Sequence, residues 1–327
     1  MAKSVDTAFA EFNKKSVNLN PERVKIARSS RDWLFVQLNK LDGDGGLEVP
    51  YKYAEMHCKF GSFARNTKIK ELDDVDLMFC LTANGAVYYK NESNYAIHTP
   101  NASQRLKNLS QDSVLNSIRV VNKIKSSLAT IEQYKSAELH SRGEAATLSL
   151  LSYEWVFDIV PCFYTDTELY LIPDGAGNWK PTDPRIDQKK VTDLNKLHTG
   201  KLLQLIRTLK FWNRHHSSYT VSSYLFESIV LNYTQTRPEL SKWIDYDVRD
   251  FLKYYSTAIM QNVNDTKGFQ GDLNTLSIDE RLSVSSKADW AHSKAIEAVN
   301  SEVNEQNQEK SINKWREIFG KDFPSYG

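Results

Sequence analysis

The amino-acid sequence predicts an α+β protein whose first half contains a sheet and whose second half is helical. Candidate strands bounded by turn residues are concentrated before residue 165, and apolar residues at helical spacing dominate after residue 185. The chain has 327 residues, of which 40% are hydrophobic, so it can bury a large core. This length predicts one bilobal unit or two closely packed domains. We place the boundary between the two parts at residue 165, which gives residues 1–165 and 166–327.

Two helices are expected at the start of the chain. Residues 4–14 form a short amphipathic pattern, and a longer helix is predicted from Pro21 to about residue 40, with Asn20 as its N-cap. The run DGDGG at 42–46 ends this helix. We interpret it as a turn, because a calcium loop would need glycine at its sixth position and an acid at its twelfth.

The following segments change to strand-like alternation and tight turns. Strands are predicted at 53–60 and 74–82, with a hairpin partner at 86–90 and a further strand at 153–163. Apolar residues at helical spacing in 111–135 predict a helix that covers one face of this sheet.

After a predicted loop at 173–184, the second half is helical. Helices are predicted at 186–198, 200–216, 221–236, 240–262, 286–304 and 308–319. The segment 263–285 is rich in Asn, Asp, Gly, Thr and Ser, which predicts a mobile surface loop.

Composition argues against several classes of function. The 42 basic and 41 acidic residues nearly cancel, so the chain lacks the basic field that binds long nucleic acid. The N-terminus has no apolar signal-peptide core, and no apolar run reaches the roughly 18 to 20 residues that cross a bilayer. We therefore expect a cytoplasmic protein without a membrane partner. Cys58, Cys80 and Cys162 lie in apolar segments without CxxC spacing, which is typical of reduced, buried thiols.

The chemically informative segment begins with GSFARNT at 61–67 and continues as LDDVDLM at 72–78. Side chains two apart on a strand share a face, so Asp74 and Asp76 can converge while their neighbours enter the core. Mg²⁺ prefers such oxygen ligands, and a two-metal site needs a third acid from a neighbouring strand. We expect that acid to be Asp158, because an acid inside the apolar strand WVFDIVP is costly to bury without compensation.

The Gly61-Ser62 turn is the predicted phosphate-binding element. It precedes Arg65 and can present backbone N–H groups and a hydroxyl to a phosphate with no Cβ in the way. Arg65 and Thr67 either contact the substrate or brace the loop by hydrogen bonds.

Each of these patterns has a plainer interpretation. A DxD pair alone is often a solvated strand or turn, and Asp158 alone could be a structural acid. Asp73 alternates to the opposite face, which favours a solvated residue over a ligand. The combination of the three acids with the Gly61 turn favours a phosphoryl-transfer site.

The segment GSFARNTKIKELDDVDLMFCL (61–81) is similar to the signature of the cGAS/DncV-like nucleotidyltransferases, bacterial synthases of cyclic oligonucleotide signals related to animal cGAS and oligoadenylate synthase. FDIVPCF (157–163) resembles their third-carboxylate strand. LQLIRTLKFWN (203–213) and VSSYLFE (221–227) resemble the helical lobe that closes over the nucleotide. The resemblance implies a polymerase-β-like palm, a helical C-terminal lobe and a central cleft.

The resemblance also implies roles for individual residues. Asp74, Asp76 and Asp158 would be catalytic and would ligate two Mg²⁺ ions, with Mn²⁺ as an alternative. The nucleotide-binding residues would be Gly61, Ser62, Arg65, Lys210, Ser223 and Tyr224. Ser62 would hold the donor triphosphate, Lys210 and Ser223 would contact phosphates, and Tyr224 would stack on a base. Alternatively, Lys210 is an exposed helix cation and Tyr224 packs in the core.

The implied activity is Mg²⁺-dependent joining of nucleoside triphosphates, including ATP, into a cyclic di- or trinucleotide second messenger with release of pyrophosphate. The family implies a role in antiphage (CBASS-type) defence, in which the product activates a separate effector. The alternatives are a template-independent RNA or tRNA nucleotidyltransferase, which the near-zero net charge disfavours, and a non-catalytic nucleotide-binding regulator, which the three acids disfavour.

Expected partners are few. We expect a monomer that requires no long nucleic acid. The C-terminal Gly327 is either an ordinary frayed end or, as in some operons of this family, the attachment point for an operon-encoded conjugation or regulatory partner.

Overall fold

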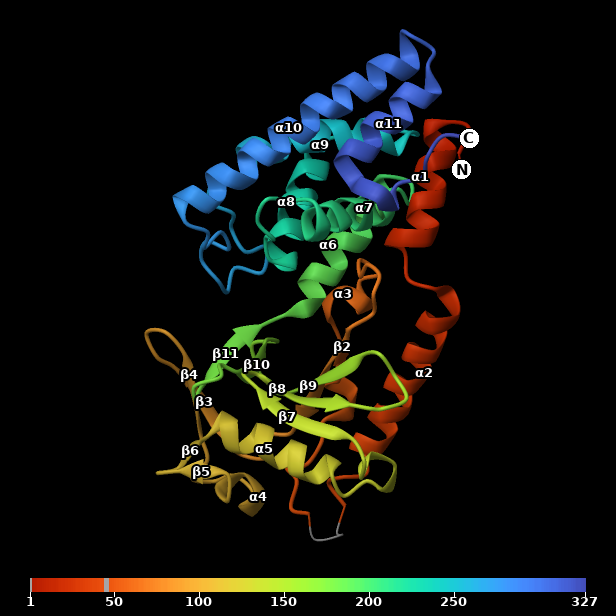
Figure 1. The fold of residues 1–327 in the computed structure, drawn as a ribbon. Coiled ribbons are helices and arrows are strands. Elements are labelled where there is room, and N and C mark those ends of the chain that lie inside the picture. Colours follow the sequence, from red (N-terminus) through yellow and green to blue (C-terminus); the bar gives the residue numbers. More distant parts are fainter. Residues whose placement is uncertain (1, 44–46) are drawn as a thin grey trace. The chain divides into compact units, whose positions relative to one another are not determined.

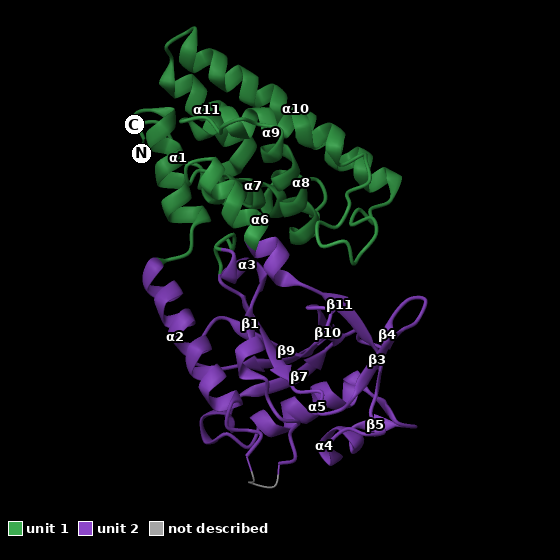
Figure 2. Ribbon diagram, turned by 180° about the vertical axis from the view of Figure 1, so that it is seen from behind, with its two compact units in different colours: residues 1–20, 66–71, 189–327 green, residues 21–65, 72–188 purple. Residues whose placement is uncertain are grey.

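The computed structural model describes residues 2–43 and 47–327 and divides into two compact units (Figure 1, Figure 2). The helical unit comprises residues 1–20, 66–71 and 189–327, and the sheet unit comprises residues 21–65 and 72–188. This division differs from the predicted one at residue 165. The segment 166–188 continues the sheet, and the first helix packs with the C-terminal helices.

The sheet unit is built on two parallel strands, β2 (Asp74–Leu81) and β9 (Val156–Tyr164). In the described residues the sheet has eleven strands, and its main path runs β1-β2-β9-β10-β11-β4-β6-β5. The remaining strands are β1 (Cys58–Lys59), β3 (Val87–Lys90), β4 (Tyr95–His98), β5 (Ser110–Gln111), β6 (Val114–Leu115), β7 (Glu138–Arg142), β8 (Ala145–Ser149), β10 (Tyr170–Pro173) and β11 (Trp179–Thr182).

The predicted strands 74–82 and 153–163 are confirmed by β2 and β9, whereas two other expectations were wrong. The segment 53–60 contains only the short strand β1 after a 3-10 turn at Ala54–Met56. The strand near 86–90 exists, but β3 pairs with β4 rather than with β2. The predicted loop 173–184 contains β11, and the hairpin β7–β8 was not anticipated.

Helices α2 (Pro21–Leu38) and α5 (Ser117–Leu128) pack against the sheet. Pro21 opens α2 as predicted. The Asn116 side chain accepts a hydrogen bond from the N–H of Arg119, so α5 begins later than the predicted residue 111. Its buried face packs on β8, β9 and β10, and α2 packs on β2. Of the predicted turn at 42–46, residues 44–46 lie outside the described residues.

The helical unit contains α1 (Val5–Phe12), α7 (Leu202–His215), α8 (Ser223–Gln235), α9 (Ile244–Ala258), α10 (Ile278–Val303) and α11 (Gln308–Phe319). Helix α6 (Pro184–Leu197) begins in the sheet unit and continues into the helical unit from residue 189. Each predicted helix is present. The expected loop 263–285 is shorter, because the side chains of Ser277 and Glu280 form a capping box that starts α10 at Ile278. Asn274, buried in this loop, donates to the backbone carbonyls of Ile259 and Gln261.

An aromatic cluster holds the two ends of the chain together within the helical unit. Phe9 of α1 packs edge-on against Trp315 and Phe323, with ring centroids 5.0 and 4.9 Å away. Ala2 and Tyr326 form a parallel β-bridge. The C-terminal segment is therefore docked, which corrects the expectation of a frayed or flexible tail.

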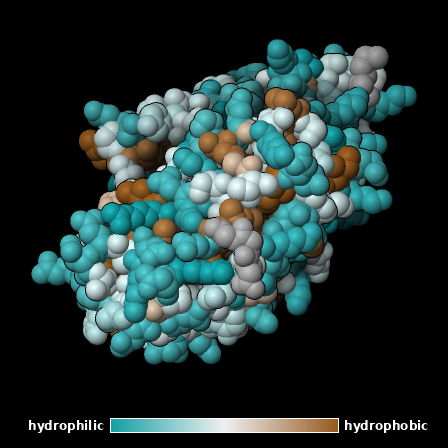
Figure 3. All heavy atoms as spheres, turned by 90° about the horizontal axis from the view of Figure 1, so that it is seen from below, coloured by the Kyte–Doolittle hydropathy of each residue, from teal (hydrophilic) through white to brown (hydrophobic). Residues whose placement is uncertain are grey.

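The expected burial of the thiols is confirmed for two of the three cysteines. Cys80 and Cys162 are buried, Cys58 is half-buried, and all three are free. None of the helices in residues 2–43 and 47–327 combines the length and apolar character that a bilayer crossing needs. On the face in Figure 3, hydrophobic residues form small separate groups among hydrophilic ones.

Candidate active site

The three candidate metal ligands lie on one face of the two parallel strands. Asp76 of β2 is directly opposite Asp158 of β9, and Asp74 lies two residues earlier on β2. Partners in register on neighbouring strands point to the same face, about 4.8 Å apart. Val75 and Leu77, which alternate with the acids, are fully buried. The alternation predicted for DVD is therefore confirmed.

The same face becomes apolar farther along both strands. Met78 and Cys80 of β2 pack with Val160 and Cys162 of β9 in a buried cluster. The acids thus occupy one end of a face whose remainder is core, and they are half-buried. Asp73 is exposed, as expected for a solvated residue.

Gly61 brings the predicted phosphate turn against this acidic end. Its φ of +75° lies in the left-handed region, and a Cβ there would be 2.6 Å from the Cγ atom of Asp76 and closer still to its carboxylate. The turn continues as α3 (Gly61–Ala64), in which Phe63 is buried and Ser62 is half-buried. The Arg65 N–H closes the turn on the Gly61 carbonyl at 3.2 Å. Glycine is therefore required here by both conformation and space.

These residues fit magnesium ions. Within residues 2–43 and 47–327, no three His, Cys, Asp or Glu side chains are arranged so that they could hold a metal ion by themselves. Mg²⁺ usually binds through one or two carboxylates together with substrate phosphates and water, rather than in an all-protein cage. Asp74, Asp76 and Asp158 supply hard oxygen ligands on one face, and the Gly61 backbone leaves room beside them.

The second part of the GSFARNT motif belongs to the helical unit. Thr67 is fully buried, and its hydroxyl donates to Oε2 of Glu227 at 2.9 Å. Arg207 donates to the Asn66 carbonyl at 2.7 Å and to Oδ1 of Asn18 at 2.7 Å. Thr67 thus braces the loop, which is one of the two roles expected for it.

Lys210 reaches the same carboxylate from α7. Its Nζ lies 3.4 Å from Oε2 of Glu227, and the two residues are 5% and 3% exposed. The alternative that Lys210 is an exposed helix cation is therefore wrong. A buried ion pair fixes geometry more reliably than it adds stability, because both ions must be desolvated.

The first turn of α8 carries the other two predicted nucleotide-binding residues. Ser223 is exposed, and Ser222 caps the helix by accepting from the Leu225 N–H. The Tyr224 hydroxyl donates to Oδ1 of Asp265 at 2.7 Å, and Nζ of Lys267 lies 4.1 Å from the centroid of the Tyr224 ring. These contacts fix the ring of the half-buried Tyr224.

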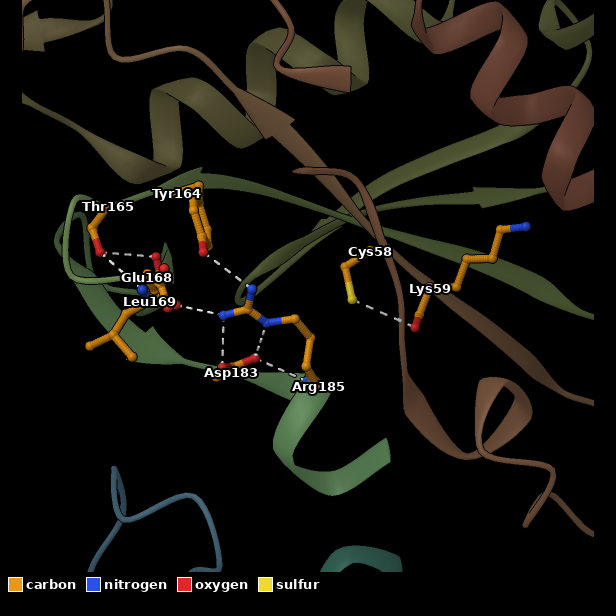
Figure 4. Close-up of polar contacts among 8 residues, drawn as sticks. All are labelled: Cys58, Lys59, Tyr164, Thr165, Glu168, Leu169, Asp183 and Arg185. Carbon is orange, nitrogen blue, oxygen red and sulfur yellow. Dashed lines mark hydrogen bonds and ion pairs between the residues drawn. The ribbon is translucent and has the colours of Figure 1, made fainter. Parts of the chain in front are cut away.

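An arginine clamp that sequence reasoning missed organises segment 164–185 (Figure 4). Arg185 donates to the carboxylate of Asp183, the Tyr164 hydroxyl and the Glu168 carbonyl. The Asp183 hydrogen bonds raise the pKa of the Arg185 guanidinium. The clamp ties the β9–β10 turn to the start of α6. The sequence signal that was available is Asp183 directly before Pro184, a helix-start pattern.

Comparison with known proteins places this geometry in a family. The sequence model of the Second Messenger Oligonucleotide or Dinucleotide Synthetase (SMODS) domain matches residues 3–195. A probable cyclic nucleotide synthase of Bacillus cereus (strain VD146) is 42% identical over 339 residues, which covers 100% of this chain and 99% of the relative. The chain belongs to the SMODS family. It is therefore an enzyme of the nucleotidyltransferase class, of the cyclic nucleotide synthase type.

Further relatives agree with this membership. A cyclic AMP-AMP-AMP synthase of an Acinetobacter species (strain ATCC 27244 / 9458) is 27% identical over 177 residues, which covers 51% of this chain and 50% of that protein. The structure of Escherichia coli MS115-1 CdnC with ATP superposes with a TM-score of 0.71 at 14% identity, over 98% of this chain and 99% of that one.

Vibrio cholerae DncV, a cyclic AMP-GMP synthase, gives a TM-score of 0.68 at 9% identity, over 99% of this chain and 98% of that one. At these identities the superpositions show the fold alone. They confirm the predicted α+β nucleotidyltransferase fold, and the family match confirms the resemblance to the cGAS/DncV-like enzymes.

Proposed function

We propose that this SMODS enzyme joins nucleoside triphosphates, ATP among them, into a cyclic di- or trinucleotide with release of pyrophosphate, and that it requires Mg²⁺. One observation carries the proposal: Asp76 and Asp158 are in register on neighbouring parallel strands, with the Gly61 turn against Asp76. Phosphoryl transfer needs this combination of oxygen ligands and a close-lying backbone turn.

The residues divide the chemistry among them. The backbone N–H groups of the Gly61 turn and the Ser62 hydroxyl hold the donor triphosphate. Asp74, Asp76 and Asp158 hold the magnesium ions, which supply charge neutralisation on the triphosphate and a more acidic attacking hydroxyl.

In the transfer step, an oxygen–phosphorus bond forms between a ribose hydroxyl and the donor α-phosphorus, and the bond to the departing pyrophosphate breaks. A carboxylate oxygen of Asp158 accepts the hydroxyl proton. A second transfer of the same kind closes the ring. Correct positioning accounts for most of the rate, as expected for phosphoryl transfer.

The helical unit would contribute orientation. We propose that Ser223 contacts phosphate and that Tyr224 stacks on a base, since its ring is held in place by Asp265 and Lys267. Lys210 is buried against Glu227, the residue that also accepts from Thr67. We therefore propose that Lys210 helps to position the Thr67 loop in addition to contacting phosphate.

The test is product identification by mass spectrometry after incubation with all four ribonucleoside triphosphates and Mg²⁺, followed by phosphatase treatment. We expect a phosphatase-resistant cyclic product from the wild type, none from the Asp74→Ala/Asp76→Ala variant, and an undiminished yield from Asp73→Asn, the exposed neighbour that serves as the matched control. Linear products would instead support the template-independent polymerase, and equal yields from wild type and the double variant would refute the assigned site.

The biological setting is proposed from the family. We propose that the enzyme is a monomer in antiphage defence, which light scattering and phage plating on cells carrying the native operon would test. Gly327 is exposed, although its N–H donates to the Ala2 carbonyl at 3.3 Å, so conjugation there would need release of the docked tail. Unchanged conjugation after Gly327→Glu would remove that idea.

A further inference from the structure

A pocket within the helical unit is lined by residues of α1, of α10 and of the start of α9. Figure 1 labels these three helices. Its volume is about 410 Å³. We call it the acidic pocket, and its defining residues are Asp6, Trp243, Asp245, Tyr246 and Glu302. None of them belongs to the proposed nucleotidyl-transfer site.

Three carboxylates from three different helices meet in this pocket. Asp6 is on α1, Asp245 is on α9 and Glu302 is on α10. Asp245 is 5% exposed, and its Oδ2 atom has no hydrogen-bond partner. A buried polar atom normally finds a partner, so an unpaired carboxylate oxygen in a pocket wall is a sign that a donor belongs there.

The cations near this pocket do not neutralise it. Arg249 donates to Asp250, and its guanidinium lies over the Tyr246 ring. Lys242 lies over Trp243, with Nζ 4.8 Å from the ring centroid. In the described part of the chain, Asp6, Asp245 and Glu302 form no ion pairs. Three acids therefore share one pocket without an ion-pair partner among the described residues.

Asp245 and Glu302 accordingly hold their protons more tightly than usual. Burial, assisted by the negative charge of Glu302, raises the pKa of Asp245 to about 7. Burial also raises the pKa of Glu302, and Asp6 acts in the same direction. Arg249 opposes the shift at Asp245, and Gln308, which donates to Glu302 at 3.2 Å, opposes the shift at Glu302. A bound cation would relieve this repulsion.

The chemistry of the pocket favours an organic cation over a metal ion. The cavity is far larger than a metal ion. Trp243 and Tyr246 also line the pocket, and their rings already attract the side chains of Lys242 and Arg249, so the pocket lining suits ammonium and guanidinium groups. We propose that the acidic pocket binds a primary ammonium or guanidinium group, donated to the Asp245 and Glu302 carboxylates. The group comes from a polyamine or from a Lys or Arg side chain of a partner protein.

The direct test is isothermal titration calorimetry of the full chain with three probes: spermidine, N-acetyl-lysine amide and N-acetyl-arginine amide. The titrations are made at about pH 8, where Asp245 is ionised. Asp245→Asn and Glu302→Gln should each weaken binding about tenfold or more, as expected for loss of a charge-assisted hydrogen bond. Glu309→Gln, an exposed acid outside the pocket, should leave the affinity within about twofold.

The outcomes separate the sources and decide the proposal. Tighter binding of spermidine identifies a polyamine, and tighter binding of an amino-acid amide identifies a partner side chain; both support the site when the variants weaken them. Binding weaker than about 10 mM for all three probes would overturn the proposal. So would equal affinities in wild type and both pocket variants. Far-ultraviolet circular dichroism of each variant confirms that it is folded.

Discussion

Replacement of Gly61 by alanine is the sharpest test of the site geometry. The residue has φ of +75°, where alanine is disfavoured by about 1–2 kcal/mol. The added Cβ would lie 2.6 Å from Cγ of Asp76, so either the turn or the carboxylate must move by about 1 Å to reach ordinary contact. A displacement of about 1 Å lowers rates by about 100-fold. We therefore expect Gly61→Ala to lower kcat/KM by about 100-fold or more.

The assay measures release of pyrophosphate under saturating Mg²⁺, with thermal melting as a check on folding. Gly85→Ala is the matched control, because Gly85 also has positive φ (+88°) and its Cβ would lie 2.7 Å from the Asn101 carbonyl oxygen, away from the three acids. The control should lose stability and keep its turnover. If Gly61→Ala kept more than about a tenth of the wild-type rate, the inferred contact with Asp76 would not control catalysis.

Three further predictions concern the brace, the acidic pocket and the metal. Thr67→Val should destabilise the protein by about 1–3 kcal/mol in urea unfolding and lower turnover, whereas Thr67→Ser, which keeps the hydroxyl and loses one buried methyl, should cost about 1 kcal/mol and keep its turnover. A loss under about 0.5 kcal/mol for Thr67→Val would contradict the bond to Glu227. Because the folded pKa of Asp245 is raised from 3.8 to about 7, its stabilising contribution is complete below about pH 4 and is lost as the pH rises through 7, by up to about 4 kcal/mol. Asp245→Asn should lack this loss, so melting curves of wild type and variant that run parallel from about pH 5 to 8 would contradict it. Chelation with EDTA should abolish product formation and added Mg²⁺ should restore it, whereas turnover that persists in EDTA would exclude the assignment of Asp158 as a metal ligand.

The sequence was sufficient to predict the catalytic strands because their signal is local. Asp74, Asp76 and Asp158 interrupt apolar alternation, and an ionisable residue between buried neighbours has few interpretations. The sequence indicated that a third acid was needed from a neighbouring strand. It did not indicate the register that places Asp76 opposite Asp158.

The missed features depend on partners that are distant in the chain. Strand β7 consists mostly of polar and charged residues, and apolar and polar residues do not alternate clearly along it. Only its pairing with β8 therefore identifies it as a strand. Lys210 could not be recognised as buried, because its counter-ion Glu227 is on the next helix. Asp245 sits in the first turn of α9, where an acid is ordinary, and its burial, together with the charge of Glu302 from α10, makes it unusual.

The GSFARNT motif illustrates why a continuous sequence signature need not be one structural element. Its first five residues belong to the sheet unit, with Gly61 against Asp76, whereas 66–71 belong to the helical unit, where Ile69 joins the core and Thr67 bonds to Glu227. The chain then returns to the sheet unit at Leu72, just before β2. The turn and the catalytic strand are thus joined by a segment anchored in the other unit. Residues 66–71 connect directly to the Gly61 turn on one side and to β2 on the other. We therefore expect a change at Thr67 that shifts this segment to alter turnover as well as stability.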